Sequence, residues 1–403
     1  MVDLYSSPSS DLLVLPMIAG IAVKRISEYF SQSTPKLLNI PPYHLPPSAR
    51  EAIATVIYES QGWRDLGVPA NFLNDSKFQA FLRLYGDFPR GLEQVLIVYH
   101  EALRSKVPFS EVAATSVFTQ YSEAMKKLVP QQNTKEIASS IFRSYFSEKV
   151  FGQDENLFFG AQSIFTVSEA MDLGLVSKDS ISKTEFKLRV PISTFVAFRS
   201  LFDGLPQLED AFKTFDKNGG DLLQAVGPGF LIFRANVLFG PNAIVTLADL
   251  LPGAQFYPPE CGNRQVQYPP HLNFETLSQN LSKENLGVAK LPGRMVRTAE
   301  RQPGFDCLWP LQTLPEKPVV LLAINWKKIK ASASSTAKSA FSTSAKVLKE
   351  LNLNDTVVGI VASGTAENLP AFLDDLENKP EAAFLINQTS FREFFGPFSE
   401  HID

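Results

Sequence analysis

The stretch GFDCLWPLQTLPEKPVVLLAINWKKIK, residues 304–330, decides how the second half of this chain folds. Its second segment, 319–325, is a run of Val, Leu, Ala and Ile up to residue 324, which predicts a central strand covered on both faces. Asp306 comes directly before the first apolar segment, and the second segment ends at Asn325, with Lys327 two positions later. The predicted strands therefore carry an acid, an amide and a lysine at their ends.

The segments that follow complete an α/β pattern. A Ser-, Ala- and Lys-rich segment at about 333–351 predicts a long helix, and TVVGIVA at 356–362 predicts the next strand. Strand, helix and strand in succession indicate an α/β core. We expect 319–325 to lie between the strand that follows Asp306 and the strand 356–362, with the helix crossing from one to the other.

Composition narrows the class of protein. The 403 residues are 44% hydrophobic and carry a formal net charge of −4, which excludes a globally basic nucleic-acid binder but allows a local basic face. Cys261 and Cys307 show neither a zinc spacing nor a disulfide framework, so we expect reduced, buried thiols in an intracellular protein. The early apolar run at 12–23 is shorter than the ~20 residues of a membrane span and lacks the preceding basic segment of a signal peptide. It predicts a buried strand and no membrane contact.

The lysines of the second half are concentrated around the predicted strand end and the predicted helix. Between residues 320 and 350 there are six lysines and a single acid, Glu350. On a helix, Phe341 and Leu348 share the apolar side, whereas three of the lysines gather on another side. The lysines are interpreted either as one surface that faces phosphate groups or as a helix face that simply meets solvent. The six candidates for nucleic-acid contact are Lys327, Lys328, Lys330, Lys338, Lys346 and Lys349.

Three units are expected along the chain, 1–104, 105–205 and 220–403, with the polar, Gly-rich segment 206–229 as the break before the third. In the middle unit, a helix that ends at Gly174 and a hairpin that leads to TEFKLRVPI resemble a winged helix with a two-stranded wing. The helix VSEAMDLGL in this unit is acidic and has no Lys or Arg. This composition argues against DNA contact by the middle unit.

The first unit carries three segments in a suggestive order, VLPMIAG, LNIPPYHLPPSAREAI and LYGDFPRGLEQVL. In this order they resemble the last part of a STAND or AAA-type ATPase module, as in the Crinkler and retrotransposon-hot-spot-like proteins. The helical lid of that family has a motif that is matched here by Gly86, Pro89, Arg90, Leu92 and Glu93.

The resemblance implies that Arg90 approaches a nucleotide phosphate; the alternative is an exposed or capping arginine. No G-x-x-x-x-G-K-[ST] sequence occurs in the chain. Without that phosphate-binding loop we expect neither tight binding nor hydrolysis of a nucleotide. The strand that carries such a loop would lie upstream of Met1, so the first unit is interpreted either as the remnant of an ATPase or as the truncated end of a longer one.

The third unit, over about 220–365, resembles the restriction-endonuclease-like, or PD-(D/E)XK, fold that Crinkler proteins carry after their ATPase. In that family a helix supplies a glutamate, one strand supplies an aspartate, and the next strand supplies Glu/Gln-x-Lys. The acidic oxygens hold Mg²⁺ at the scissile phosphate, and the lysine positions or polarises the attacking water. The resemblance places Asp306 as the catalytic and metal-binding aspartate. It places Asn325 at the Glu/Gln position of Glu/Gln-x-Lys and Lys327 at the Lys position.

The match to this site is incomplete. Asn325 offers a neutral amide oxygen where an acid or Gln is usual. The helix GFLIFRANVLF, 229–239, is similar to the family's Phe-Glu-x-Phe helix, but Leu231 stands in place of the glutamate. Mg²⁺ usually takes one or two carboxylates besides the phosphates of the substrate, so one aspartate and one amide assist it only weakly. The acids that would restore the site are Glu260, Glu275 or Glu300.

The sequence thus favours a Crinkler-like, effector-type protein whose nuclease-like domain contacts nucleic acid through a degraded catalytic site. One alternative is an active Mg²⁺-dependent DNA or RNA endonuclease, and another is a protein-interaction scaffold. The number of carboxylates within metal reach of Asp306 separates the first two. A nuclear address is implied by the resemblance alone.

Overall fold

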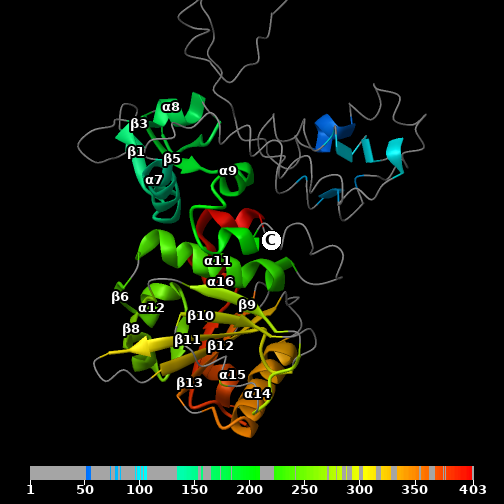
Figure 1. Ribbon diagram of the computed structural model, residues 1–403, viewed down its shortest axis with the longest axis vertical. Helices are drawn as coiled ribbons and strands as arrows, with labels where there is room; N and C mark the ends of the chain where they lie inside the picture. The colour runs from blue at the N-terminus through cyan, green and yellow to red at the C-terminus, as the bar shows by residue number, and fades with distance from the viewer. Residues whose placement is uncertain are drawn as a thin grey trace, which may run out of the picture.

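The structure is a computed structural model that describes, with short gaps, residues 134–208 and 222–401, together with scattered residues between 51 and 106. Helices and sheets are mixed along this part of the chain, so the predicted α/β class is confirmed (Figure 1). Some of the predictions fall outside the described residues: the strand at 12–23, the lid motif with Arg90, and the side chains of Lys327, Lys328, Lys330 and Glu300.

A nine-stranded mixed sheet forms the middle layer of the larger unit. Its strands are β6 (Ile244–Thr246), β7 (Gln255–Tyr257), β8 (Gln265–Gln267), β9 (Asn273–Thr276), β10 (Arg294–Arg297), β11 (Cys307–Thr313), β12 (Val319–Lys327), β13 (Thr356–Ala362) and β14 (Ala382–Ile386). The main path runs β6-β8-β11-β12-β13-β14-β7, and β10 with β9 branches from β11. β12, β13 and β14 are parallel to one another, whereas β11 and β7 pair with their neighbours antiparallel.

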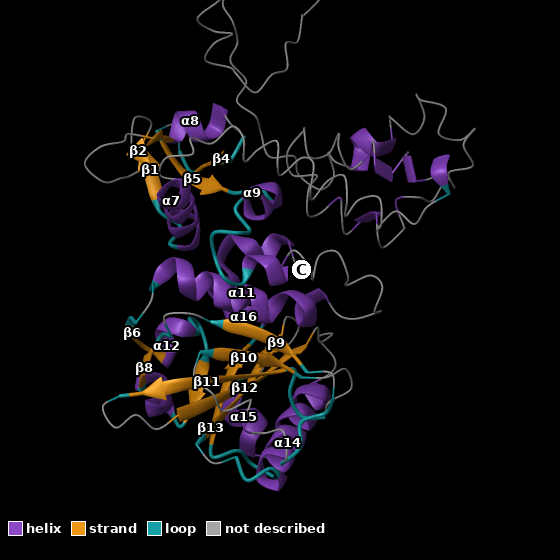
Figure 2. Ribbon diagram, in the orientation of Figure 1, coloured by secondary structure: helices purple, strands orange, loops and turns teal. Residues whose placement is uncertain are grey.

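Helices cover both faces of this sheet (Figure 2). They are α11 (Leu222–Leu238), α12 (Leu247–Leu250), α14 (Ser334–Glu350), α15 (Leu369–Asp374) and α16 (Gln388–Phe395), with the 3-10 turns η4 (Pro259–Asn263) and η5 (Gly396–His401). α14 and α15 lie against one face, and α11 and α16 lie against the other. α14 joins β12 to β13 and α15 joins β13 to β14, as parallel strands require a crossover connection.

β12 lies in the centre of the sheet. Its Ile324 is opposite Cys307 of β11 on one side and beside Gly359 of β13 on the other. The predicted central position of 319–325 is therefore confirmed, as are the helix between the two parallel strands and the strand 356–362.

The side chains of β12 alternate between two hydrophobic cores, because successive residues of a strand point to opposite faces. Leu322 and Trp326 belong to the core that contains α11 and α16. Leu321 and Ala323 belong to the core that contains α14 and α15. The strand is covered on both faces, which explains its continuous apolar sequence.

α11 corrects one prediction. The segment 206–229 was expected to be a break, yet the helix begins at Leu222 and contains the Gly-Pro-Gly sequence at 227–229. A Cβ atom on Gly227 would overlap the indole ring of Trp326, so glycine lets the helix lie directly on β12. Close packing overrides the low helix propensity of glycine and proline here. Among the described helices, none is long and apolar enough to cross a membrane.

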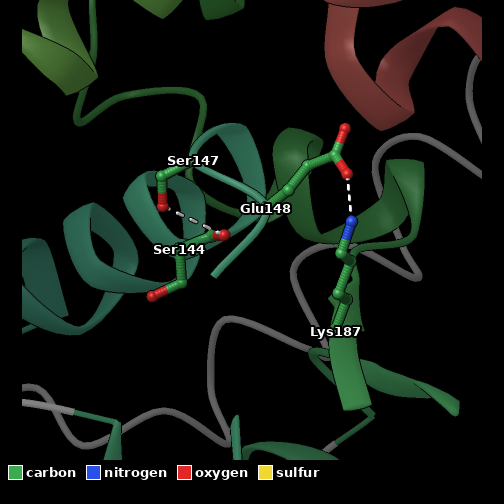
Figure 3. A network of polar contacts seen from close by, with 4 residues as sticks. All are labelled: Ser144, Ser147, Glu148 and Lys187. Atoms are coloured by element: carbon green, nitrogen blue, oxygen red, sulfur yellow. Dashed lines mark hydrogen bonds and ion pairs between the residues drawn. The ribbon is translucent and has the colours of Figure 1, made fainter. Parts of the chain in front are cut away.

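A smaller unit packs on the other side of α11. It comprises α7 (Thr134–Phe146), β1 (Val150–Gly152), β2 (Asn156–Leu157), β3 (Phe165–Thr166), α8 (Val167–Asp172), β4 (Ser177–Ser180), β5 (Glu185–Arg189) and α9 (Ile192–Ala197). β1, β5 and β4 form an antiparallel sheet in that order, and β4 with β5 is the hairpin that the sequence predicts after Gly174. Figure 3 shows how the end of α7 is held: Glu148 forms an ion pair with Lys187 of β5.

The two units share one hydrophobic core. The ring of Phe142 in α7 lies 5.0 Å from that of Phe233 in α11, centroid to centroid, in an edge-on contact. The guanidinium of Arg143 donates hydrogen bonds of 3.2 and 3.3 Å to the carbonyl of Val237, in the last turn of α11. The expected break between the second and third units therefore does not separate their cores.

We expect Gly227→Ala to destabilise the protein by roughly 2 kcal/mol or more, because the added methyl group overlaps Trp326 in a packed core. In an exposed helix the same change would be stabilising. Urea denaturation measures the free energy of unfolding. Gly152→Ala is the control, since no atom lies within 4 Å of the Cβ position there. Equal stability of the two variants would contradict the close contact between α11 and β12.

Candidate functional site

Asp306 closes the end of the ladder between β11 and β12. Its backbone N–H donates to the carbonyl of Ile324 at 2.9 Å, and its own carbonyl accepts the N–H of Thr298 at 3.0 Å. One carboxylate oxygen, Oδ2, accepts the backbone N–H of Trp326 at 2.7 Å. The carboxylate therefore fixes the last residues of β12, which is a structural use of this acid.

Asn325 is buried, with only 3% of its surface exposed. Its Nδ2 donates to the carbonyl of Gly304 at 2.7 Å and to the hydroxyl of Ser344 in α14 at 3.0 Å. That hydroxyl also contacts the Gly304 carbonyl and lies 2.7 Å from the carbonyl of Ala340; it has one proton and so donates to one of them at a time. Strand, loop and helix are thus joined through one amide, and we call Gly304, Asp306, Asn325 and Ser344 the polar junction.

Gly304 is required at the polar junction for two reasons. Its φ of +100° lies in a region that favours glycine. A Cβ atom there would also come within 3.2 Å of Val347 and 3.4 Å of the Cα atom of Ser344, so α14 packs directly on the loop backbone. The loop that carries Asp306 is therefore held by both β12 and α14.

The structure brings Asp306 and Asn325 together, as the sequence predicts, but it uses both side chains for folding. The Asp306 carboxylate binds the main chain of β12, and the Asn325 amide is turned toward α14. No group of three or more His, Cys, Asp or Glu side chains that could hold a metal ion is found in the described part of the chain. The described donors therefore amount to one engaged carboxylate, which does not suit a resident Mg²⁺.

The acids that might complete the site lie elsewhere or are already paired. Glu260 is in η4, next to Arg264, whose guanidinium pairs with Asp355 at 2.9 Å just before β13 begins. β12 and β13 are parallel, so this is the opposite end of the sheet from the polar junction. Glu275 of β9 lies closer in the sheet but forms a 3.2 Å ion pair with Arg294.

Leu231 stands on the other face of the sheet. It is fully buried in the core that contains Trp326, whereas Asn325 contacts α14 on the opposite face. A glutamate at position 231 would therefore lie across the sheet from the polar junction. The family's helix glutamate has no equivalent at this position of α11.

The candidate lysines divide between β12 and α14. Lys327 is the last residue of β12, two positions after Asn325. Lys346 and Lys349 are exposed and stand three residues apart on α14, so they are neighbours on the helix surface. Lys338 is half-buried on the same helix. The structure therefore places two of the predicted lysines on one open helix face.

Sequence reasoning missed three residues that shape this region. Ser344 binds the Asn325 amide, Thr298 donates through its hydroxyl to the carbonyl of Phe305 at 2.9 Å, and Arg297 lies opposite Cys307 across the ladder. They come from segments far apart in the chain, and no local spacing signals that they meet. Only the pairing of β10 with β11, and of α14 with the sheet, brings them together.

Comparison with known protein families, curated proteins and solved structures gives no match for this chain.

Asn325→Asp tests whether this position can accept an acid. A carboxylate would face the Gly304 carbonyl in a buried place, which raises the pKa of the new group above the usual Asp value of ~3.9. The folded state then holds the proton more tightly than the unfolded state, so stability falls as pH rises through and above that value. We expect a loss of roughly 3 kcal/mol near pH 8 and a smaller loss near pH 5.

Chemical denaturation at the two pH values measures this difference. Ser344→Ala is the control, because it removes one hydrogen-bonding hydroxyl without adding a titratable group and should cost about 1 kcal/mol at either pH. A pH-independent loss for Asn325→Asp would show that the side chain reaches water or a cation.

Cys261 and Cys307 are free and buried, as predicted. Burial raises the pKa of the Cys307 thiol to about 12, and burial also raises the pKa of the Cys261 thiol. Because the thiolate is the reactive form, we expect iodoacetamide at about pH 8.5 to alkylate neither cysteine in the folded protein and both in denaturing urea, as read by mass spectrometry. Rapid alkylation of native Cys307 would contradict its burial beneath α11.

Proposed function

We propose that residues 220–403 form a nuclease-like domain of a Crinkler-like, effector-type protein, and that this domain contacts nucleic acid but has lost the site for metal-dependent cleavage. The order of elements supports the fold assignment. A buried helix, α11, precedes the strands β10, β11 and β12, and the helix α14 then leads to the parallel strand β13. Asp306, directly before β11, and Asn325, near the end of β12, are the residues to which the resemblance assigns catalytic roles.

One observation supports the proposed loss of metal-dependent cleavage: the Asn325 side chain is buried and hydrogen-bonded to Gly304 and Ser344. The position that resembles a metal-binding acid is neutral and holds α14 on the sheet. Asp306 alone, with one oxygen already bound to the N–H of Trp326, leaves a weak site for a divalent cation. We therefore derive no hydrolytic step through Mg²⁺.

The nucleic-acid contact rests on local charge. Lys346 and Lys349 are exposed neighbours on α14, Lys327 ends β12, and the chain as a whole is acidic. Ammonium groups that neutralise phosphates release condensed counterions, which gives affinity without base recognition. A basic face on an acidic protein confines such binding to one side of the molecule.

The other two units complete the proposal. Residues 1–104 are proposed as the last part of an ATPase-type module, and because residues 1–403 contain no G-x-x-x-x-G-K-[ST] sequence we expect no tight nucleotide binding by these residues. The α7 to α9 unit, with its β1-β5-β4 sheet, is proposed as a winged-helix-like linker rather than a DNA reader. Its helix α8 has one acidic residue, Glu169, in the first turn and no basic residue in the last.

The double variant Lys346→Gln/Lys349→Gln tests the binding face. We expect the dissociation constant for a fluorescein-labelled 20-mer duplex to rise about tenfold at low salt, and the slope of log affinity against log salt to fall by about two units. Fluorescence polarisation measures both. Lys135→Gln/Lys149→Gln removes the same charge from exposed lysines of the smaller unit and should change affinity less than about twofold.

The same preparations are incubated with Mg²⁺ or Mn²⁺ and the oligonucleotide products are separated on a gel. We expect no cleavage by the unmodified protein, and Asp306→Asn should hold or raise affinity because a negative charge is removed near phosphate. Robust cleavage that disappears in Asp306→Asn would establish the active endonuclease instead. A protein that binds neither duplex nor single strand at low salt would favour the scaffold.

A further inference from the structure

Arg297 ends β10 beside the polar junction. It lies opposite Cys307 in the antiparallel ladder, and the N–H of the next residue, Thr298, donates to the carbonyl of Asp306 at 3.0 Å. Paired residues of neighbouring antiparallel strands are about 5 Å apart at Cα. Arg297 therefore stands next to the acid that the nuclease resemblance singles out, at the end of the sheet where β12 finishes with Lys327.

The two arginines of β10 differ in what they bind. Arg294 forms a 3.2 Å ion pair with Glu275 of the neighbouring strand. Arg297 is half-buried, and in the described part of the chain no carboxylate or carbonyl oxygen accepts a hydrogen bond from its guanidinium. A guanidinium carries five N–H donors and stays charged at every physiological pH, so a half-buried one is suited to an external anion.

Two described carboxylates lie near Arg297, and each is already engaged. Glu275 of β9 pairs with Arg294, and the Asp306 carboxylate accepts the Trp326 N–H. Buried Asn325 contributes an amide and no charge. Neither carboxylate accepts a hydrogen bond from the Arg297 guanidinium, so its N–H donors are left for an anion from outside the chain.

We propose that Arg297 is a phosphate-binding residue of the nucleic-acid interface, with its guanidinium taking two oxygens of one phosphodiester at the end of β10. The proposal rests on the proposed function and adds to it a contact that lies on the sheet rather than on α14. A bidentate pair fixes the orientation of the phosphate as well as its position, which the point charges of Lys346 and Lys349 do not. Arg297 thereby sets where the backbone of the nucleic acid crosses the sheet end.

Arg297→Gln and Arg294→Gln form a matched pair in one short strand. With the same labelled duplex, we expect Arg297→Gln to weaken binding about tenfold and to lower the salt slope by about one unit. Arg294→Gln should leave both within about twofold, because that arginine is already paired with Glu275. Arg297→Lys should keep the salt slope but recover only part of the affinity, since it retains the charge and loses the planar fork.

The outcomes separate this inference from the proposed function. If the unmodified protein binds and the α14 double variant weakens binding, but Arg297→Gln behaves like Arg294→Gln, Arg297 is not a phosphate contact and only the inference is overturned. If the unmodified protein does not bind the oligonucleotide, the proposed function is overturned and the inference with it. The urea midpoint of each variant is measured as a control for folding. If Arg297→Gln lowers the midpoint, the affinity of Arg297→Lys decides whether the contact exists. Full affinity in Arg297→Lys would overturn the bidentate contact.

Discussion

The packing of α11 between the large sheet and the smaller unit is the constraint on which the rest of the structure depends. This helix is apolar around its whole circumference, as expected for one with partners on every side. Gly227 lets it lie against Trp326 of β12, and Phe233 packs against Phe142 of α7. Even its one buried cation, Arg234, serves packing: the guanidinium donates to the carbonyl of Leu250 at 3.2 Å, and burial lowers its pKa to about 10.

This packing determines the geometry of the polar junction. Because Trp326 must point toward α11, the residue before it must point toward α14. Asn325 can then donate to the Gly304 carbonyl and to the Ser344 hydroxyl, whereas an ionised acid could only accept from the hydroxyl and would leave the carbonyl without a donor from position 325. The backbone N–H of Trp326, at the end of the strand, is satisfied by Asp306. Core packing on one face thus decides which polar group is tolerated on the other.

How much of this could be read from the sequence depends on whether the signal is local. The strand at 319–325, the helix after it and the strand at 356–362 carry strong periodic or continuous apolar patterns, and the structure has all three. The first turns of α11 were missed because Gly-Pro-Gly at 227–229 is a local breaker, and only the contact with Trp326 explains it. Asp306 and Asn325 were paired correctly because both flank neighbouring strands. Ser344 was missed because its partner is a loop carbonyl 40 residues away.

The same end of a sheet can serve metal chemistry or phosphate binding, and the number of carboxylates gathered there separates the two. A site for Mg²⁺ gathers carboxylates that offset the charge of the ion before the substrate arrives. Among the described side chains at this end, the Asp306 carboxylate is held by a main-chain N–H, position 325 is a buried amide, and the Arg297 guanidinium is half-buried. On the proposed function, such a sheet end holds a phosphodiester without supplying the ion or the base that would cleave it. The neutral Asn325 that joins α14 to the sheet is then the same residue that leaves the metal site incomplete.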